Sequence, residues 1–377
     1  MKKRVVILGA GFAGLELASR LSDSVADEVD VTLIDQSDAF TFGFSKLDIL
    51  FGRKTPEDVR IPYREISRRG VEFRQEHVTS IDPENRRVTT DETSYDADIL
   101  VVALGATYDH AVTPGFEDGG HEYYTVAGAE RLRDALPAFE SGTILIGILG
   151  QPYKCPPAPF ECAFLLHDHL VGRGAREAAE IRVIGPMAAP VPVTAQVSQA
   201  FLDALHARDI EYTARNRVVE LDIERKEAVL ESGERLSYDL FVGIPIHRVP
   251  DVVEASGLTA DGWVVVDRAN LMTPYPGVYA VGDIVNIPMA KAGVFAENAA
   301  GVVADDIVAR LHGEKLGRSY EGEGSCYLEF GGGKVAKVVA NFLGGPSPTA
   351  RFDGPSEALA AEKAAFAETR RARWFGT

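Results

Sequence analysis

The chain has 377 residues, a length that predicts two or three domains rather than a single core. The composition is that of a globular protein, with 46% hydrophobic and 25% charged residues. The formal net charge of −17 at pH 7 argues against nucleic acid as a partner, because a phosphate backbone requires a basic surface. No run of about 20 apolar residues occurs, so the sequence predicts no membrane span.

The N-terminal segment predicts a dinucleotide-binding unit. Residues 4–8 form a short β-branched strand, and the turn G-A-G-F-A-G follows at residues 9–14. A segment with helical periodicity comes next, and residues 30–35 predict a second strand that ends in an acid. This order of strand, glycine turn, helix, strand and acid is typical of nucleotide-binding folds. Because glycines interrupt the first apolar run, we interpret it as a strand and not as a signal peptide, and we expect a cytoplasmic location.

Each glycine of the turn has a predicted task. Gly9 allows the tight turn, Gly11 lets the backbone approach a pyrophosphate, and Gly14 lets the helix pack closely on the strand. The N-terminus of the helix offers free N–H groups and a positive dipole end to the phosphates. Asp35 is placed to accept a hydrogen bond from a ribose hydroxyl.

Two later segments favour FAD over NAD as the dinucleotide. Residues 101–106 (VVALGA) resemble the A-T-G segment of flavoproteins that have two dinucleotide domains. Residues 273–283 (TPYPGVYAVGD) resemble their second FAD motif, in which Asp283 would bind the ribityl chain or a phosphate and Gly282 would allow close approach of the flavin. The three motifs together resemble those of the FAD-binding disulfide-reductase superfamily.

This resemblance implies an α/β fold with two Rossmann-like domains, each with three ββα layers, and a small C-terminal α+β domain. The FAD-binding domain is expected to be discontinuous, at residues 1–115 and 265–317. The second Rossmann-like domain is expected at 116–264, and the C-terminal domain with its terminal helix at 318–377.

The second glycine turn differs from the first. Gly147 to Gly150 precede a proline-rich stretch at residues 151–161, and a helix is expected from about 163 to 171. Prolines remove backbone N–H donors, so a pyrophosphate would lose most of its binding groups there. We therefore expect weak or absent binding of NAD(P)H.

Cys155 lies inside this proline-rich stretch. Pro156 and Pro157 suit the first turn of a helix, which puts Cys155 near the N-cap. A thiol in that place is expected to have a lowered pKa and redox activity. The alternative is a small buried residue at the start of a helix.

Three segments and one isolated cysteine resemble the sulfide:quinone oxidoreductase family and the related flavoprotein subunit of flavocytochrome c sulfide dehydrogenase. The segments are C-P-P-A-P-F-E at 155–161, I-P-I-H-R-V-P at 244–250 and A-K-A-G-V-F-A-E-N at 290–298, and the cysteine is Cys326. The resemblance implies that Cys155 and Cys326 lie beside the flavin, where sulfide attacks their bridge and two electrons pass through FAD to a quinone.

Two further residues receive roles from this resemblance. Lys291 resembles a family lysine near the flavin pyrimidine ring, and the alternative is a solvated surface lysine. Glu161 is expected either to move protons during sulfide attack or to hold the helix N-terminus in place. The expected catalytic residues are Cys155, Cys326, Lys291 and Glu161. The expected FAD contacts are Gly9, Gly11, Phe12, Ala13, Gly14, Asp35, Gln36, Lys46, Val78, Ala103, Gly105, Gly282, Asp283, Lys291 and Gly293.

The remaining cysteine pattern departs from the family in two places. Members that reduce quinone often carry a third cysteine where this chain has residues 121–127, and the cytochrome-linked members often attach FAD through a cysteine where it has residues 41–46. Neither segment contains a cysteine, so FAD is expected to be non-covalent. Cys162 is interpreted as a core residue, and no metal site is expected.

The C-terminal region predicts strands over residues 318–345 with a glycine-rich turn at 330–334, a linker at 346–355 and a helix at 356–375. Ser356 is the expected N-cap. The helix either contacts a membrane surface with Trp374 at the interface, on the cytoplasmic face, or docks on the FAD domain.

Three functions remain open from the sequence. The first is a sulfide:quinone oxidoreductase-like enzyme with a quinone or another small electron acceptor. The second is a type II NADH:quinone oxidoreductase, which the altered second turn disfavours. The third is an FAD-binding protein without turnover that responds to redox state. A homodimer is compatible with each of them.

Overall fold

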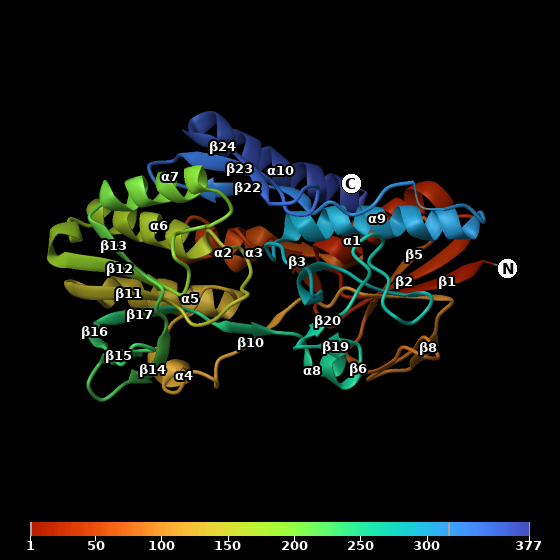
Figure 1. Cartoon of the computed structure of the whole chain (residues 1–377), viewed down its shortest axis with the longest axis horizontal. Helices are drawn as coiled ribbons and strands as arrows, with labels where there is room; N and C mark the ends of the chain where they lie inside the picture. The colour runs from red at the N-terminus through yellow and green to blue at the C-terminus, as the bar shows by residue number, and fades with distance from the viewer. Residues whose placement is uncertain (1, 316, 377) are drawn as a thin grey trace.

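The computed structural model describes residues 2–315 and 317–376, and it contains two similar α/β domains side by side with a third layer across both (Figure 1). The first domain is built on a parallel sheet in the order β21-β9-β1-β2-β5. Its strands are β1 (Lys3–Leu8), β2 (Val29–Asp35), β5 (Val71–Gln75), β9 (Ile99–Val102) and β21 (Val278–Ala280). The central strand β1 is apolar and fully buried from Val5 to Leu8 because layers cover both faces of the sheet.

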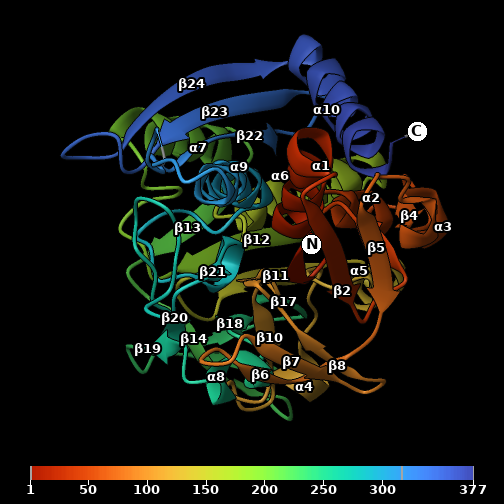
Figure 2. The same cartoon turned by 90° about the vertical axis from the view of Figure 1, so that its right-hand side faces the viewer.

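Helices cover one face of this sheet and a small antiparallel sheet covers the other. Helices α1 (Phe12–Val25) and α9 (Gly293–Leu311) pack against each other above the strands (Figure 2). Below them lie β6 (Val78–Asp82), β7 (Arg87–Thr90) and β8 (Ser94–Asp96). The three-layer ββα arrangement is therefore confirmed for this half of the molecule.

The second half repeats the plan. Its parallel sheet has the order β13-β12-β11-β17, and its strands are β11 (Gly142–Ile148), β12 (Ala179–Gly185), β13 (Ile210–Ala214) and β17 (Leu240–Ile244). The helices are α5 (Val126–Ala135), α6 (Ala158–Gly172) and α7 (Ala195–His206), and the small sheet is β14 (Val218–Asp222), β15 (Glu227–Leu230) and β16 (Arg235–Ser237). Helix α6 begins five residues before the predicted start at about 163, because Pro157 serves as its N-cap and Pro159 fits the first turn.

Several short elements lie between and beside the two halves. The chain passes from one domain to the other twice. The two connecting segments pair with each other as the antiparallel strands β10 (Thr107–Asp109) and β18 (Ile246–Arg248). The others are β3 (Ala39–Thr41), α2 (Ser45–Leu50), α3 (Pro56–Val59), β4 (Arg60–Pro62), α4 (Phe116–Gly119), α8 (Asp251–Ala255), β19 (Thr259–Ala260) and β20 (Trp263–Val264), with 3₁₀ turns at Tyr63–Glu65, Leu136–Ala138, Arg176–Ala178 and Gly282–Ile284.

The C-terminal layer is an antiparallel sheet followed by a long helix. Strands β22 (Glu323–Glu329) and β23 (Val335–Asn341) form the predicted hairpin, closed by a bond from the Lys334 N–H to the Gly331 carbonyl oxygen. The predicted linker at 346–355 is wrong, because β24 (Thr349–Ser356) pairs with β23 there as an edge strand. Its glycine, proline and charged side chains hide the strand pattern in the sequence.

The terminal helix α10 (Glu357–Phe375) docks on the first domain. The Ser356 hydroxyl caps it by accepting from the Leu359 N–H, as predicted. Trp374 is 1% exposed and packs edge-on against Phe12 and Phe40. Its indole N–H donates to Glu16, which also accepts from Arg373. Trp374 is therefore unavailable to a membrane interface. None of the helices in the described part of the chain is long and apolar enough to cross a membrane.

Candidate active site

A cavity of about 520 Å³ runs from the glycine turn of the first domain to the two cysteines. Residues of the first domain, of the segment before α5, of the start of α6, of β22 and of the C-terminal helix α10 meet in it. Fourteen of the residues expected at the site line this cavity: Gly9, Gly11, Phe12, Ala13, Asp35, Lys46, Ala103, Gly105, Cys155, Glu161, Gly282, Asp283, Gly293 and Cys326.

The glycine turn is shaped as a phosphate-binding site. Gly9 has φ +98°, and a Cβ there would overlap the Ala103 carbonyl group. A Cβ on Gly14 would overlap the Gly9 carbonyl oxygen, which explains the close contact of helix and strand. A Cβ on Gly11 would meet open space, and α1 begins at the next residue with its N–H groups free. A pyrophosphate fits at this helix N-terminus.

The end of β2 and the turn after β21 form further parts of the cavity wall. Asp35 accepts hydrogen bonds from the N–H groups of Ala10 (2.7 Å) and Ser37 (2.8 Å), which fixes its carboxylate at the cavity wall. Gly282 has φ +83°, which glycine adopts without strain. Burial raises the pKa of the neighbouring Asp283, and the charges of Lys154 and Lys291 oppose the rise. These residues fit the adenosine, pyrophosphate and ribityl parts of FAD.

Four expected site residues lie outside this cavity. Gly14 packs helix against strand, and the side chain of Val78 is buried in the core. Gln36 is exposed because it follows Asp35 on the opposite face of the chain, and its side-chain oxygen contacts His77 Nδ1 at 2.8 Å. Lys291 lines a second cavity instead.

The cysteine end of the first cavity contains a thiol and a buried carboxyl in contact. Cys155 precedes the N-cap of α6 and has φ +54°, and its N–H donates to the Lys291 carbonyl oxygen at 2.7 Å. Its Sγ lies 3.8 Å from Glu161 Oε2, while Glu161 Oε1 accepts from the Glu329 N–H at 2.8 Å. Cys326 lies on β22, and both cysteines are free thiols.

The predicted lowering of the Cys155 pKa is wrong for this arrangement. Burial raises the pKa of Cys155 well above its ordinary value, and the charges of Glu161 and Cys326 add to the rise. The helix begins three residues later, at Ala158, so its dipole does not outweigh these effects. Burial also raises the pKa of Cys326 to about 12 and that of Glu161 to about 7. Cys162 is fully buried in α6, as predicted.

A second cavity, of about 830 Å³, reaches Cys326 from the other side. The loops after β11 and β12 form one wall, at the edge of the second sheet where a dinucleotide binds in a doubly wound fold. Pro152, Pro156 and Pro157 stand in that wall. The cavity is mostly apolar, with Arg268 and Lys291 as its cations. Lys291 is 6% exposed, so the alternative of a solvated surface lysine is wrong.

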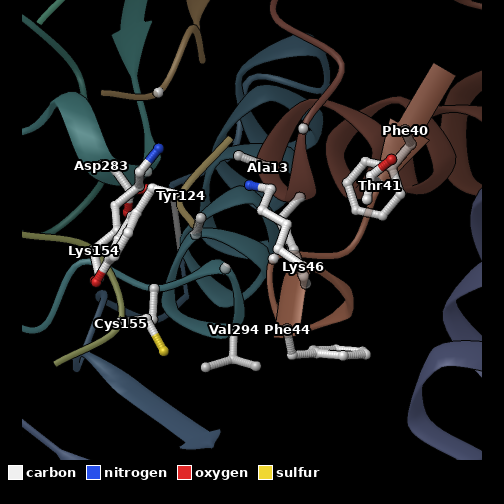
Figure 3. A pocket seen from close by; sticks show the side chains of 18 of the residues that line it. Ala13, Phe40, Thr41, Phe44, Lys46, Tyr124, Lys154, Cys155, Asp283 and Val294 are labelled. Carbon is white, nitrogen blue, oxygen red and sulfur yellow. The ribbon is translucent and has the colours of Figure 1, made fainter. Parts of the chain in front are cut away.

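Several residues that sequence reasoning missed also line the first cavity. They are Phe44, Tyr63, Tyr108, Tyr123, Tyr124, Lys154, Tyr327 and Phe366. Lys154 is adjacent to Cys155 in the sequence, and that position is the only signal that could have identified it. Figure 3 shows Lys154, Tyr124 and Cys155 on one side of the cavity, and Lys46 extending toward them from the other.

Known proteins resemble this chain in sequence and in fold. Residues 3–299 match the family described as pyridine nucleotide-disulphide oxidoreductase. The mitochondrial sulfide:quinone oxidoreductase of Mus musculus is 25% identical over 374 residues, covering 94% of this chain and 82% of that protein. The solved sulfide:quinone oxidoreductase of Aquifex aeolicus has a TM-score of 0.89 at 23% identity, covering 99% of this chain and 92% of that one. A type II NADH:quinone oxidoreductase of Staphylococcus aureus is 32% identical over 133 residues, which cover 35% of this chain and 33% of that protein. The chain belongs to the pyridine nucleotide-disulphide oxidoreductase family and is an FAD-dependent oxidoreductase.

Proposed function

We propose that this enzyme takes two electrons from sulfide, or from a related thiol or sulfane sulfur, through Cys155 and Cys326, and passes them through FAD to a quinone-type acceptor. One observation carries the proposal: two cysteines from distant parts of the sequence line the cavity that the FAD motifs form. The full-length similarity to named sulfide:quinone oxidoreductases supports it.

The two cavities suggest separate routes for donor and cofactor. Cys326 lines both cavities, whereas Cys155 lines only the one that holds the FAD motifs. We expect the donor to enter the second cavity and to attack the Cys326 sulfur of a Cys155–Cys326 bridge. The sulfur of Cys155 then leaves as a thiolate on the side of the flavin.

The step balances in atoms and charge. When HS⁻ attacks, a sulfur–sulfur bond forms at Cys326, the bond to Cys155 breaks, and Cys326 carries a persulfide. In net terms HS⁻ yields one sulfur atom at oxidation state zero, one proton and two electrons, and bound FAD would take up the two electrons and the one proton. FAD supplies the two-electron acceptor. Glu161, 3.8 Å from Cys155 and with a pKa raised to about 7, is placed to take and return the proton.

A quinone-type acceptor fits the aromatic part of the first cavity. Phe44, Tyr327 and Phe366 line it there, and flat apolar rings bind well between aromatic side chains. Lys363 and Glu329 form a buried ion pair at 2.6 Å next to this region, with the Lys363 amino group 5.1 Å from the centre of the Phe44 ring. This pair would supply a charged hydrogen-bond donor near an acceptor carbonyl.

Two alternatives remain testable. Similarity to a type II NADH:quinone oxidoreductase favours an NADH donor, but it extends over about a third of the chain, and prolines occupy the second dinucleotide site. An FAD-binding protein without turnover would keep its flavin oxidised with every donor.

Parallel anaerobic titrations of the FAD-bound protein with sulfide and with NADH test the proposal. Sulfide should bleach the flavin absorbance and NADH should not. Cys155→Ser and Cys326→Ser should abolish bleaching by sulfide, and Cys162→Ala, at the fully buried third cysteine, should retain it. Normal bleaching in Cys155→Ser, or rapid reduction by NADH, would overturn the proposal.

A further inference from the structure

Lys291 does not present its charge to the FAD cavity. Its amino group donates to the carbonyl oxygens of Asp283 (2.6 Å) and Val285 (3.3 Å), and it lies 3.6 Å from the centre of the Trp263 ring. Lys291 and Trp263 both line the second cavity. The family resemblance places the positive charge of Lys291 near the flavin. In this chain that amino group instead contacts two backbone carbonyl oxygens and the Trp263 ring.

Two other lysines line the FAD cavity. Lys154 Nζ donates to the Ala106 carbonyl oxygen at 3.0 Å and lies 4.4 Å from the centre of the Tyr108 ring. Lys46, on α2, reaches in from the facing wall (Figure 3). Within residues 2–315 and 317–376, the Lys46 amino group has no hydrogen bond or ion pair to protein atoms.

Both lysines lie at the cysteine end of the cavity. Burial lowers the pKa of Lys46 to about 8; repulsion from Lys154 adds to this, while the charges of Glu122 and Cys155 oppose it. Lys154 also does more than Lys291 to offset the effect of burial on the pKa of Asp283. Lys46, Lys154 and Cys155 line the same cavity (Figure 3).

Two cations facing one enclosed space repel each other, and a cation without a partner is costly to bury. The arrangement becomes favourable when a negative charge arises between them. Two-electron reduction of a flavin with uptake of one proton leaves one negative charge, which is delocalised in the pyrimidine ring.

We propose that Lys46 and Lys154 flank the redox end of bound FAD and stabilise the negative charge of its reduced form, so that together they set the reduction potential of the flavin. This assignment depends on FAD and not on the identity of the donor or the acceptor. A unit charge several ångströms away changes the relative stability of the two flavin states by at least about tenfold at an effective dielectric constant of about 20.

The test measures the midpoint potential of the bound flavin by stepwise enzymatic reduction beside a reference dye. Lys46→Met and Lys154→Met should each weaken binding of reduced FAD relative to oxidised FAD by about tenfold, which lowers the potential of a two-electron couple by about 30 mV. Lys46→Arg and Lys154→Arg should retain most of the potential because they keep the charge. Lys334→Met removes a lysine that is exposed and does not line the cavity, and it should leave the potential unchanged.

Unchanged potentials in both methionine variants, or the same shift in Lys334→Met, would overturn the proposal. If a methionine variant does not retain FAD, the glutamine variant at that position is titrated in the same way and the same criterion applies. The titration uses neither sulfide nor quinone. A protein that fails to react with sulfide but shows the lysine-dependent potential would therefore reject the proposed donor and support this inference.

Discussion

Replacement of Glu161 by glutamine should change how the stability of the protein depends on pH. Glu161 is 2% exposed, and burial raises its pKa from 4.5 to about 7. The folded protein therefore holds a proton between these two values that the unfolded chain has released. Stability from this group is fully present below pH 4.5 and is lost as the pH rises through about 7.

The size of the effect follows from the two pKa values. The difference between 4.5 and about 7, at about 1.4 kcal/mol per pH unit, corresponds to about 3 kcal/mol. Glutamine has no charge to lose, and its oxygen can still accept the hydrogen bond from the Glu329 N–H. Glu161→Gln should therefore gain stability relative to the parent by up to about 3 kcal/mol between pH 5 and pH 8.

Urea unfolding of both proteins at these two pH values, with the same excess of FAD, measures this change. Glu140→Gln, the same substitution at an exposed position, is the matched control and should show no such trend. A stability difference between Glu161→Gln and the parent that is equal at both pH values would refute the reasoning, because it would mean that Glu161 is ionised in the folded protein at pH 5.

Three further predictions follow from the packing. Gly14→Ala places a Cβ against the Gly9 carbonyl oxygen, so the purified variant should contain little FAD, as measured by the ratio of flavin to protein absorbance; full occupancy would contradict the assigned role of the turn. Trp374→Ala removes a side chain that is 1% exposed and should lower the free energy of unfolding by about 3–5 kcal/mol, and a thermal melt equal to that of the parent would show that α10 is not docked. Lys363→Met leaves the Glu329 carboxylate buried with only Arg53, 3.6 Å away, as a partner, and should destabilise the protein by about 3 kcal/mol; the double variant Lys363→Met, Glu329→Gln should recover much of the loss.

The sequence predicted the nucleotide turn well because its chemistry is local. Gly9 and Gly11 act through backbone geometry and Asp35 through its carboxylate, all within one strand–turn–helix–strand unit, and the fold follows from such units. The turn at 330–334 and the cap at Ser356 were predictable for the same reason.

Features that depend on distant parts of the chain were predicted less well. The raised pKa of Cys155 results from burial and from Glu161 and Cys326, which only the tertiary fold brings to it. The direction of the Lys291 side chain depends on Trp263 and on the carbonyl groups after β21. Strand β24 could not be recognised from its residues, since only its pairing with β23 makes it a strand.

The contacts of Glu16 connect the two ends of the chain. This buried carboxylate on α1 accepts hydrogen bonds from Arg373 and Trp374 of α10. Phe12, in the nucleotide turn itself, packs on the same tryptophan. Until synthesis reaches Arg373, helix α1 therefore exposes the apolar surface that Trp374 covers, and Glu16 lacks these two donors, although Arg20 on the same helix still binds it. A nascent chain that stops short of Arg373 leaves Phe12, beside the cofactor site, without this outer support.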